Sequence, residues 1–323
     1  MNTKRQSKFS LALKWRKAKT LSKNIRLGTR GSLLARTQST WVANQVASDR
    51  SVELVVIKTQ GDDLSLSLTN LATPGAFVNA LRSALINGDV DFIVHSFKDL
   101  PSQPHPELEI VAIPVREDPR DVFICNDNVS FKSLTAGSVV GTSSPRRVAA
   151  VRKLKSEILT RPIRGNIDSR IRKVRDGQYD GVILAAAGLI RIGLSSQISE
   201  YFAIEELLPA PAQGALAVEC RKNDAEMLRL LSPISDPITR LTTTAERAVL
   251  RGLNAGCDLA VSAYATYADE VLTLTAEIAD PMTGSHERIV LTKSALAAEE
   301  LGLAAANHFL ASEIGKRILQ RDN

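Results

Sequence analysis

The sequence predicts an α/β protein of two lobes that face each other across a cleft, followed by a small C-terminal α+β domain. Short apolar runs alternate with amphipathic helical stretches, and a second set of such elements resembles the first in layout. Between the two sets, residues 116–121 (Arg-Glu-Asp-Pro-Arg-Asp) bring charge and proline, which is typical of a crossing between domains. From Asp236-Pro237 onward, one long helical stretch and a run of strands replace the alternation.

The composition is that of an ordinary globular protein. Of the 323 residues, 44% are hydrophobic and 24% are charged. No window approaches the roughly 18–20 consecutive apolar residues that a membrane span requires. The three cysteines (Cys125, Cys220 and Cys257) are odd in number and widely spaced, so we expect neither a fully paired disulfide framework nor a metal site. This usage indicates a reducing compartment.

The net charge of +6 originates in the N-terminal extension. Residues 1–23 hold eight Lys or Arg and no acid, which leaves 33 basic residues (41 − 8) against 35 acidic ones, a body near −2. A nucleic-acid-binding protein carries its positive charge on the folded domain, whereas this chain carries it on a tail. We expect this tail to be a disordered, dispensable extension of a cytoplasmic protein. The alternatives are an organellar transit peptide, a long bacterial N-terminus and a basic arm for a polyanion.

The first lobe is expected to start with a strand at 25–28, a helix from 33 to about 47 and a strand at 52–57. Arg30 and Ser32 lie in the first turn, where backbone N–H groups and a helix N-terminus favour an anion. A helix cap with a surface arginine explains this turn equally well. The polar stretch 59–75 predicts a long loop near the site. The next helix has its core at Phe77, Ala80, Leu81, Ala84 and Leu85 and stops at Asn87-Gly88.

The central stretch of the chain is 89–101. Phe92-Ile93-Val94 predicts a buried strand, and Pro101 disfavours helix at the residue before it. Lys98 and Asp99 therefore follow the carboxyl end of a strand, where open α/β sheets bind their ligands. An acid beside a base at this place is a candidate catalytic pair, and the alternative is a surface ion pair on a solvated turn.

The second lobe is predicted to have strands at 122–125, 138–141, near 158 and at 181–185, with helices from 145 and 167. Eleven basic residues lie between 146 and 175, against two acids. Ser144, Arg146 and Arg147 open a helix after a strand, with Pro145 near its first position, and so predict an anion site.

Arg164 and Arg170 repeat the pattern after the next strand, and Arg191 follows a small-residue turn at 185–188. Several arginines at several strand ends predict a ligand with several carboxylates or phosphates. The chain lacks a Walker-type loop and a dinucleotide fingerprint, and aromatic residues make up only 4%. A polycarboxylate is therefore the better candidate.

The last part of the chain is predicted to fold as a helix over 238–253, strands at 259–264, 271–278 and 288–291, and a helix over 295–310. Cys257 lies in the short loop after the first of these helices. A lone cysteine is more often a small core residue than a functional one. Cys125 and Cys220, each at a strand end, are interpreted as core residues for the same reason.

Seven parts of the chain carry a combined pattern: Leu27-Gly28-Thr29-Arg30, residues 94–101 and 116–121, Gly141-Thr142-Ser143-Ser144 with Arg146-Arg147, Arg164-Gly165-Asn166, Gln213-Gly214-Ala215 and Asn254-Ala255-Gly256-Cys257. Together they resemble the porphobilinogen deaminase (hydroxymethylbilane synthase) family, from about residue 25 to residue 266. Each stretch alone is weakly specific, and their number and order make the resemblance highly specific.

The resemblance implies three domains, of which two are similar to the lobes of periplasmic binding proteins. Residues 24–115 with 213–233 would form the first lobe and 116–212 the arginine-rich second lobe. Residues 234–323 would form the domain that carries the cofactor cysteine, and 1–23 the extension. The implied activity is the head-to-tail condensation of four porphobilinogen molecules with loss of ammonia, followed by hydrolytic release of hydroxymethylbilane, in tetrapyrrole (porphyrin and haem) biosynthesis.

The resemblance also implies the site residues and partners. A dipyrromethane cofactor is attached through a thioether to Cys257, which reverses the interpretation of that residue as core, and Asp99 matches the catalytic carboxylate. The partners are porphobilinogen and the growing oligopyrrole, with no nucleic acid and no membrane, and the protein is expected to be a monomer. The residues that match cofactor-binding groups are Lys98, Ser144, Arg146, Arg147 and Arg170, and those that match substrate-binding groups are Arg30, Ser32, Arg164 and Arg191.

The chain departs from the family pattern at four positions. Pro74 replaces a lysine common at the end of the 59–75 loop, and Pro145 replaces an aliphatic residue. Gly31 and Ile190 stand where Gln and Lys are common. Two other functions compete: a non-enzymatic carboxylate-binding protein, which leaves Asp99 and Cys257 without a task, and a nucleic-acid binder that uses the tail.

Overall fold

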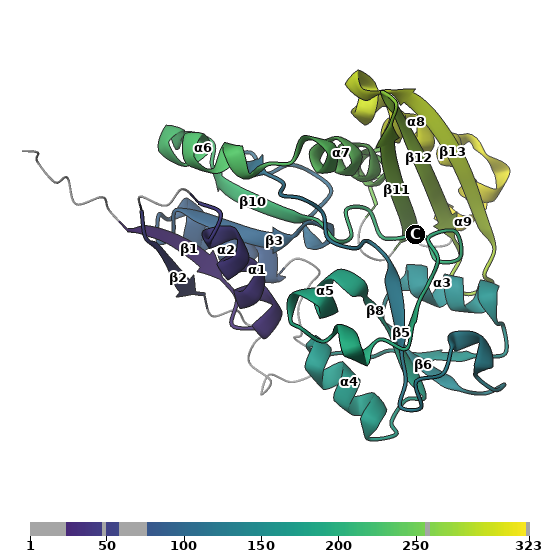
Figure 1. Cartoon of the computed structure of the whole chain (residues 1–323). Helices are drawn as coiled ribbons and strands as arrows, with labels where there is room; N and C mark the ends of the chain where they lie inside the picture. Colours follow the sequence, from purple (N-terminus) through teal and green to yellow (C-terminus); the bar gives the residue numbers. More distant parts are fainter. Residues whose placement is uncertain (1–23, 47–49, 58–75, 256–258, 321–323) are drawn as a thin grey trace, which may run out of the picture.

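The computed structural model describes residues 24–46, 50–57, 76–255 and 259–320. Within them the chain forms two five-stranded sheets, each with helices, and a three-stranded sheet packed against helices (Figure 1). The predicted fold class, two α/β lobes with a small α+β domain, is thereby confirmed. The predictions for the N-terminal extension, for the 59–75 loop and for Cys257 fall outside the described residues.

The first lobe holds a mixed sheet in the order β2-β1-β3-β10-β4. β1, β2 and β3 are parallel, whereas β10 is antiparallel to both of its neighbours. The elements of this lobe are β1 (Ile25–Thr29), α1 (Leu33–Ala43), β2 (Val52–Val56), α2 (Ala76–Ile86), β3 (Phe92–Ser96), β4 (Leu108–Ala112), β10 (Leu216–Arg221) and α6 (Ala225–Leu231).

The second lobe repeats this arrangement in the order β7-β6-β8-β5-β9. Three parallel strands are again followed by an antiparallel one, and this strand (β5 here, β10 in the first lobe) is the first that the chain forms after crossing from the other lobe. The elements are β5 (Asp121–Ile124), β6 (Val139–Gly141), α3 (Pro145–Leu154), β7 (Leu159–Arg161), α4 (Ile167–Arg175), β8 (Gly181–Ala185), α5 (Ala186–Arg191) and β9 (Glu200–Tyr201).

The C-terminal domain is an antiparallel meander packed against helices. Its core lies between α7 and α8 on one face of the sheet, around Ala245, Val249, Leu274 and Phe309. Figure 1 shows α7 lying between the first lobe and this sheet. The elements are α7 (Pro237–Gly252), β11 (Ala260–Ala268), β12 (Val271–Ala279), β13 (His286–Ser294), α8 (Ala298–Ala311) and α9 (Glu313–Gln320).

Each lobe has a mixed sheet, because the strand that enters it from the other lobe runs antiparallel. Several details differ from the sequence-based expectations. Residues 186–191 form helix α5 where a turn was predicted. A Cβ at Gly188 would lie 2.7 Å from Ile167 Cδ1, so this glycine permits close packing and does not mark a turn. Helices α6 and α9 were not predicted, and α1 ends at Ala43, four residues before the predicted end.

Candidate active site

Lys98 and Asp99 lie on a single 3₁₀ turn, Phe97–Asp99, that directly follows β3. Phe97 and Leu100, 5% and 4% exposed, anchor the turn in the core, whereas Asp99 is exposed and Lys98 is half-buried. The Phe97 N–H donates to Ala215 O (3.0 Å), which ties the turn to the start of β10. Two apolar anchors therefore present an acid and a base at the carboxyl end of a strand, as predicted.

Lys98 is the first member of a buried polar chain that joins the two lobes. Its Nζ donates to Gln213 Oε1 (3.1 Å). Gln213 is fully buried, and its Nε2 donates to Asp121 Oδ1 (3.1 Å) and to Pro119 O (2.8 Å). The pKa of Lys98 is lowered to about 8, mainly by burial and also by Arg147 and Arg146, while Asp99 and Asp121 oppose the shift. The charge of Lys98 is therefore lost only slightly above neutral pH.

Asp121 receives both arginines of the first turn of α3. Its carboxylate accepts from Arg146 Nη1 (2.6 Å) and from Arg147 Nε and Nη2 (3.0 and 2.7 Å), and all three residues are buried. Burial alone would raise the pKa of Asp121, but Arg146 and Arg147 lower it well below the usual range. The anion that these two guanidiniums bind in this structure is thus part of the protein.

The arginines at the start of α4 are placed differently. The Arg164 side chain is exposed, and Arg170 is half-buried with its Nε donating to Gly165 O (2.7 Å). Neither the two Arg170 amino groups nor the Arg164 guanidinium binds another residue of the described ranges. The pKa of Arg170 is lowered by burial and by Arg147 and raised by Asp99, so Asp99 of the first lobe lies within electrostatic reach of Arg170 of the second.

The remaining predicted residues lie near the ends of the helices that follow β1, β6 and β8. Ser32 caps α1, its Oγ accepting from the Ala35 N–H (3.3 Å), and Arg30 lies between β1 and this cap. Arg191 donates from Nη2 to Gly214 O (2.7 Å), and burial lowers its pKa to about 10, with Glu117 opposing the shift. Ser144 precedes Pro145 at the N-terminus of α3, and its hydroxyl makes no hydrogen bond within the described chain.

Sequence reasoning gave no role to several residues that build the site. Asp121 and Gln213 were quoted only as parts of family stretches, yet they join the lobes. Glu246 of α7 is fully buried and accepts from Arg116 (2.6 and 3.0 Å) and from the Ala212 N–H (2.7 Å), so it holds both crossings between the lobes. Each of the two acids had a sequence signal that could have indicated its role. Asp121 is an acid at the start of a buried strand, and Glu246 is an acid inside a helix.

The backbone of the second crossing between the lobes, at residues 212–214, explains the glycine in its sequence. Ala212 and Gly214 both have positive φ angles, of 62° and 89°. A Cβ at Gly214 would lie 2.3 Å from Glu117 O on the first crossing. Only glycine therefore allows the two crossing segments to pass this closely beneath the site.

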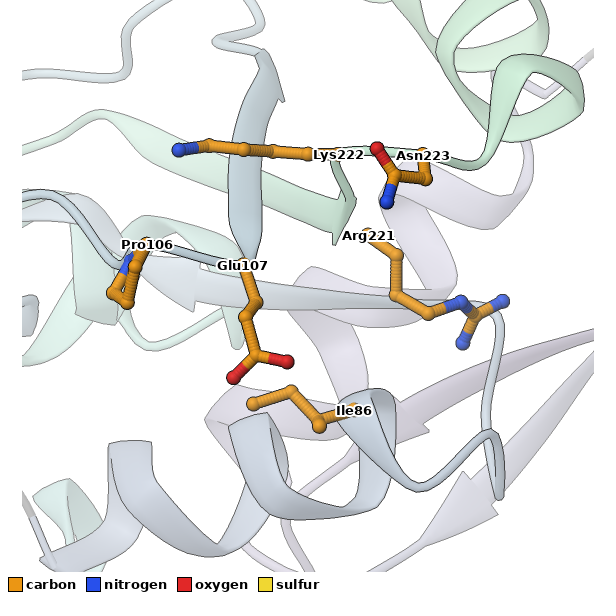
Figure 2. A pocket seen from close by; sticks show the side chains of 6 residues that line it. All are labelled: Ile86, Pro106, Glu107, Arg221, Lys222 and Asn223. Carbon is orange, nitrogen blue, oxygen red and sulfur yellow. The ribbon is translucent and has the colours of Figure 1, made fainter.

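A separate cavity of about 260 Å³ lies at the opposite end of the first sheet (Figure 2). Because β10 is antiparallel to β3, its last residues lie beside the start of β3, far from the turn that carries Asp99. The cavity contains none of the predicted site residues and is lined by Ile86, Pro106, Glu107, Arg221, Lys222 and Asn223.

The described residues lack both a metal-binding cluster and a membrane-spanning helix. They hold no group of three or more His, Cys, Asp and Glu side chains arranged to bind a metal ion. They also include no helix with the length and apolar character needed to cross a membrane.

Comparison with known proteins gives family-level matches over most of the chain. Residues 25–229 match the model of the porphobilinogen deaminase dipyromethane cofactor binding domain, and residues 240–311 match that of the porphobilinogen deaminase C-terminal domain. Porphobilinogen deaminase 1 of Streptomyces avermitilis is 49% identical over 252 residues, which covers 75% of this chain and 78% of the relative.

Other relatives and solved structures were also found. The porphobilinogen deaminase of Mycobacterium tuberculosis is 46% identical over 248 residues, covering 76% of this chain and 80% of the relative. Among solved structures, the methionine-binding protein MetQ is 14% identical over 65% of this chain and 89% of its own, with a TM-score of 0.42. That structural likeness is too weak to carry an inference.

Proposed function

Since the chain belongs to the porphobilinogen deaminase family, we propose that it condenses four porphobilinogen molecules head to tail with loss of ammonia and then releases hydroxymethylbilane by hydrolysis. The observation that supports this activity most directly is the placement of Asp99. It is an exposed carboxylate on one lobe, within electrostatic reach of Arg147 and Arg170 on the other.

The cations of the cleft suit a ligand that gains charge as it grows. Porphobilinogen carries two carboxylates, and each condensation adds two more to the product. The whole guanidinium of Arg164 and the two amino groups of Arg170 have no partner among the described residues, and such groups bind carboxylates in a bidentate manner. Arg146 and Arg147 carry two positive charges against the single negative charge of Asp121, so this buried cluster keeps a net positive charge.

The donor set also fits the dipyrromethane cofactor of the family, which carries acetate and propionate groups. We assign its covalent attachment to Cys257 and its carboxylates to Lys98, Ser144 and Arg170, with Arg146 and Arg147 providing the positive field. The Ser144 hydroxyl and the Arg170 amino groups have unused donors within the described chain. When bound, the dipyrromethane supplies the primer to which substrate pyrroles are added.

Asp99 has the task of managing charge on the substrate. Departure of ammonia from the aminomethyl group leaves a cationic methylene pyrrole, and a carboxylate held nearby stabilises that charge. The same carboxylate accepts hydrogen bonds from pyrrole N–H groups and steers the proton that leaves in the condensation. Because Asp99 makes no ion pair within the described residues, its oxygens remain available for these roles.

Arg30, Ser32, Arg164 and Arg191 are assigned to the carboxylates of the incoming substrate. Arg30 and Ser32 lie at the start of α1, whereas Arg191 lies at the end of α5, so the substrate would be held from both lobes. A Cβ at Gly188 of α5 would lie 3.8 Å from Leu34 of α1, which supports close approach of these two helices across the cleft.

We place the domain boundaries at 24–115 with 213–233, 116–212 and 234–323. The pairing of β10 with β3 and β4 supports the return of the chain to the first lobe. We further propose that the protein is a cytoplasmic monomer that acts on small molecules, without nucleic-acid or membrane partners. Size-exclusion chromatography with light scattering checks the oligomeric state.

Incubation of the purified full chain with porphobilinogen tests the proposed activity. We expect porphobilinogen to be consumed and a linear tetrapyrrole to appear. Intact-protein mass spectrometry should show a mass increase of two pyrrole units in the wild type and an unmodified chain in Cys257→Ser. An unmodified, inactive wild-type chain from a host that makes porphobilinogen would favour a non-enzymatic carboxylate-binding protein instead.

A further inference from the structure

We propose that Arg247 of α7 is a positioning residue for Asp99, because its guanidinium holds the turn that presents this carboxylate. The inference rests on the proposed function and deepens it: the first lobe supplies the acid, and the C-terminal domain fixes where the acid lies. Sequence analysis gave Arg247 no role.

The contacts of Arg247 surround Lys98 and Asp99 on both sides. Nη1 donates to Phe97 O (3.1 Å), just before the pair, and Nη2 donates to Leu100 O (3.3 Å) and to Pro101 O, just after it. The guanidinium also stacks over the Phe97 ring, 4.5 Å from its centre. A single rigid fork thus grips both ends of the segment whose middle carries the acid.

Arg247 is a buried cation without an ionised partner. It is 4% exposed, it forms no ion pair within the described ranges, and it contacts carbonyl oxygens and the Phe97 ring there. A buried cation without a carboxylate partner is costly. Burial, with Arg251 and Arg82 acting in the same direction, lowers its pKa to about 10. A leucine or methionine would fill such a position at lower cost if the carbonyl contacts had no purpose.

The neighbouring residue on α7 extends the connection. Glu246 binds Arg116 and the Ala212 N–H on the two crossings, as well as the Ala265 N–H on β11 (2.9 Å). One turn of α7 therefore holds the Asp99 turn, the crossings and the C-terminal sheet together. In sequence, α7 ends five residues before Cys257 (252 to 257). The same helix thereby links the position of the acid to the segment to which we assign the primer.

Arg240 provides a matched control on the same helix. It also reaches backbone carbonyls of the first lobe, donating from Nη2 to Val111 O (2.7 Å) and Ile110 O (3.3 Å). These carbonyls belong to β4, which carries no predicted site residue. If both arginines only attached α7 to the first lobe, substitution of either one would have the same effect on activity. If Arg247 positions Asp99, only its substitution should reduce activity.

The test compares Arg247→Lys and Arg240→Lys in the full chain carrying its cofactor. We expect Arg247→Lys to reduce kcat by about tenfold to hundredfold, because small misplacements of a catalytic group have effects of this size. The KM for porphobilinogen should remain within about twofold, since Arg247 is separated from the substrate by the turn. Arg240→Lys should leave both parameters near the wild-type values. Hydrogen exchange of the peptide covering 97–101 should accelerate in Arg247→Lys alone.

Unchanged kcat in Arg247→Lys, or equal losses of kcat in both variants, would overturn the proposal. If Arg247→Lys proves much less stable than Arg240→Lys, Phe97→Leu removes the ring beneath the guanidinium and is judged by the same two measurements. Failure of the proposed function is separately visible, because the wild type itself would then form no tetrapyrrole. In that case the exchange rates decide, and an unchanged rate at 97–101 refutes the grip of Arg247 on the turn.

Discussion

Helices α3 and α4 of the second lobe begin at the same edge of the sheet and carry arginines at their starts, yet they use them differently. On α3, Arg146 and Arg147 are buried and bound to Asp121. On α4, Arg170 keeps its amino groups unoccupied within the described residues and lies in electrostatic reach of Asp99. Positive charge at a strand end thus serves structure at one helix and is available to a ligand at the next.

The difference arises from a single acid. Asp121 is the first residue of β5, which pairs with β8, and its carboxylate binds both arginines of the first turn of α3. Arg164 and Arg170, at the start of α4, form no ion pair with a residue of the described ranges. Arg146, Arg147, Arg164 and Arg170 together form a cationic wall of the second lobe. We infer that Asp121 fixes the shape of this cationic wall and that Arg164 and Arg170 contact the ligand.

Among the changes at these two helices, removal of the Asp121 charge beneath α3 should have the largest effect on stability. Asp121→Asn leaves two buried guanidiniums without an ionised partner, and we expect a loss of about 3–5 kcal/mol in the free energy of unfolding. Urea denaturation measures it. Asp118→Asn, three residues earlier on the same crossing, is the control: its partner Arg120 is 41% exposed, so we expect a loss of at most about 1 kcal/mol. Equal losses in the two variants would contradict the assignment of Asp121.

The contrast between these two helices also marks the limit of the sequence-based predictions. The alternation of strands and helices, the crossing near 116–121 and the turn at Lys98 and Asp99 follow from local patterns, and the structure agrees with them. Whether a guanidinium is free or bound depends on partners far along the chain. Arg147 is 26 residues from Asp121, and Arg247 is 150 residues from Phe97. Local spacing carries no information about such pairs.

Two further differences have the same origin. The antiparallel entry of β10 depends on its pairing with β3, more than one hundred residues earlier in the chain. Gly188 lies in a helix, and its close packing against Ile167 explains why a glycine stands at this position. The roles predicted for Asp99, Lys98, Cys257 and the arginines remain predictions until they are measured.

Substitution at the start of the second helix should affect substrate binding and leave stability nearly unchanged. Arg164→Gln removes an exposed charged donor assigned to the substrate, and we expect the KM for porphobilinogen to rise about tenfold to hundredfold, from about 1.5–3 kcal/mol for a hydrogen bond between charged groups. Unfolding should change by no more than about 0.5 kcal/mol. Arg172→Gln, exposed on the same helix, is the control with unchanged KM. An unaltered KM in Arg164→Gln would remove Arg164 from the substrate site.

The smallest expected effect is a pH dependence that originates at Lys98. Because burial lowers its pKa to about 8, the positive charge is lost as the pH rises through 8. Because Lys98 is assigned to a carboxylate of the cofactor, turnover by the wild type should then fall by about threefold to tenfold, equivalent to about 1 kcal/mol for one charge contact. Lys98→Arg should abolish this step, since a guanidinium stays charged throughout.

The stability contribution of Lys98 has the opposite sign. Between about pH 8 and the ordinary lysine pKa near 10.4, the unfolded chain binds more protons at this position than the folded chain does. Stability therefore increases with pH in that window while turnover decreases. A turnover step that persists unchanged in Lys98→Arg would assign the titration to another group.

The central claim is that the exposed Asp99 carboxylate performs the charge-handling step opposite a cationic wall. The most direct measurement is the turnover of porphobilinogen by Asp99→Asn, an isosteric change at an exposed position. We predict a decrease of about 10²-fold to 10⁴-fold in turnover, with the free energy of unfolding within about 0.5 kcal/mol of the wild type. Turnover close to that of the wild type in a stably folded Asp99→Asn protein would contradict the account.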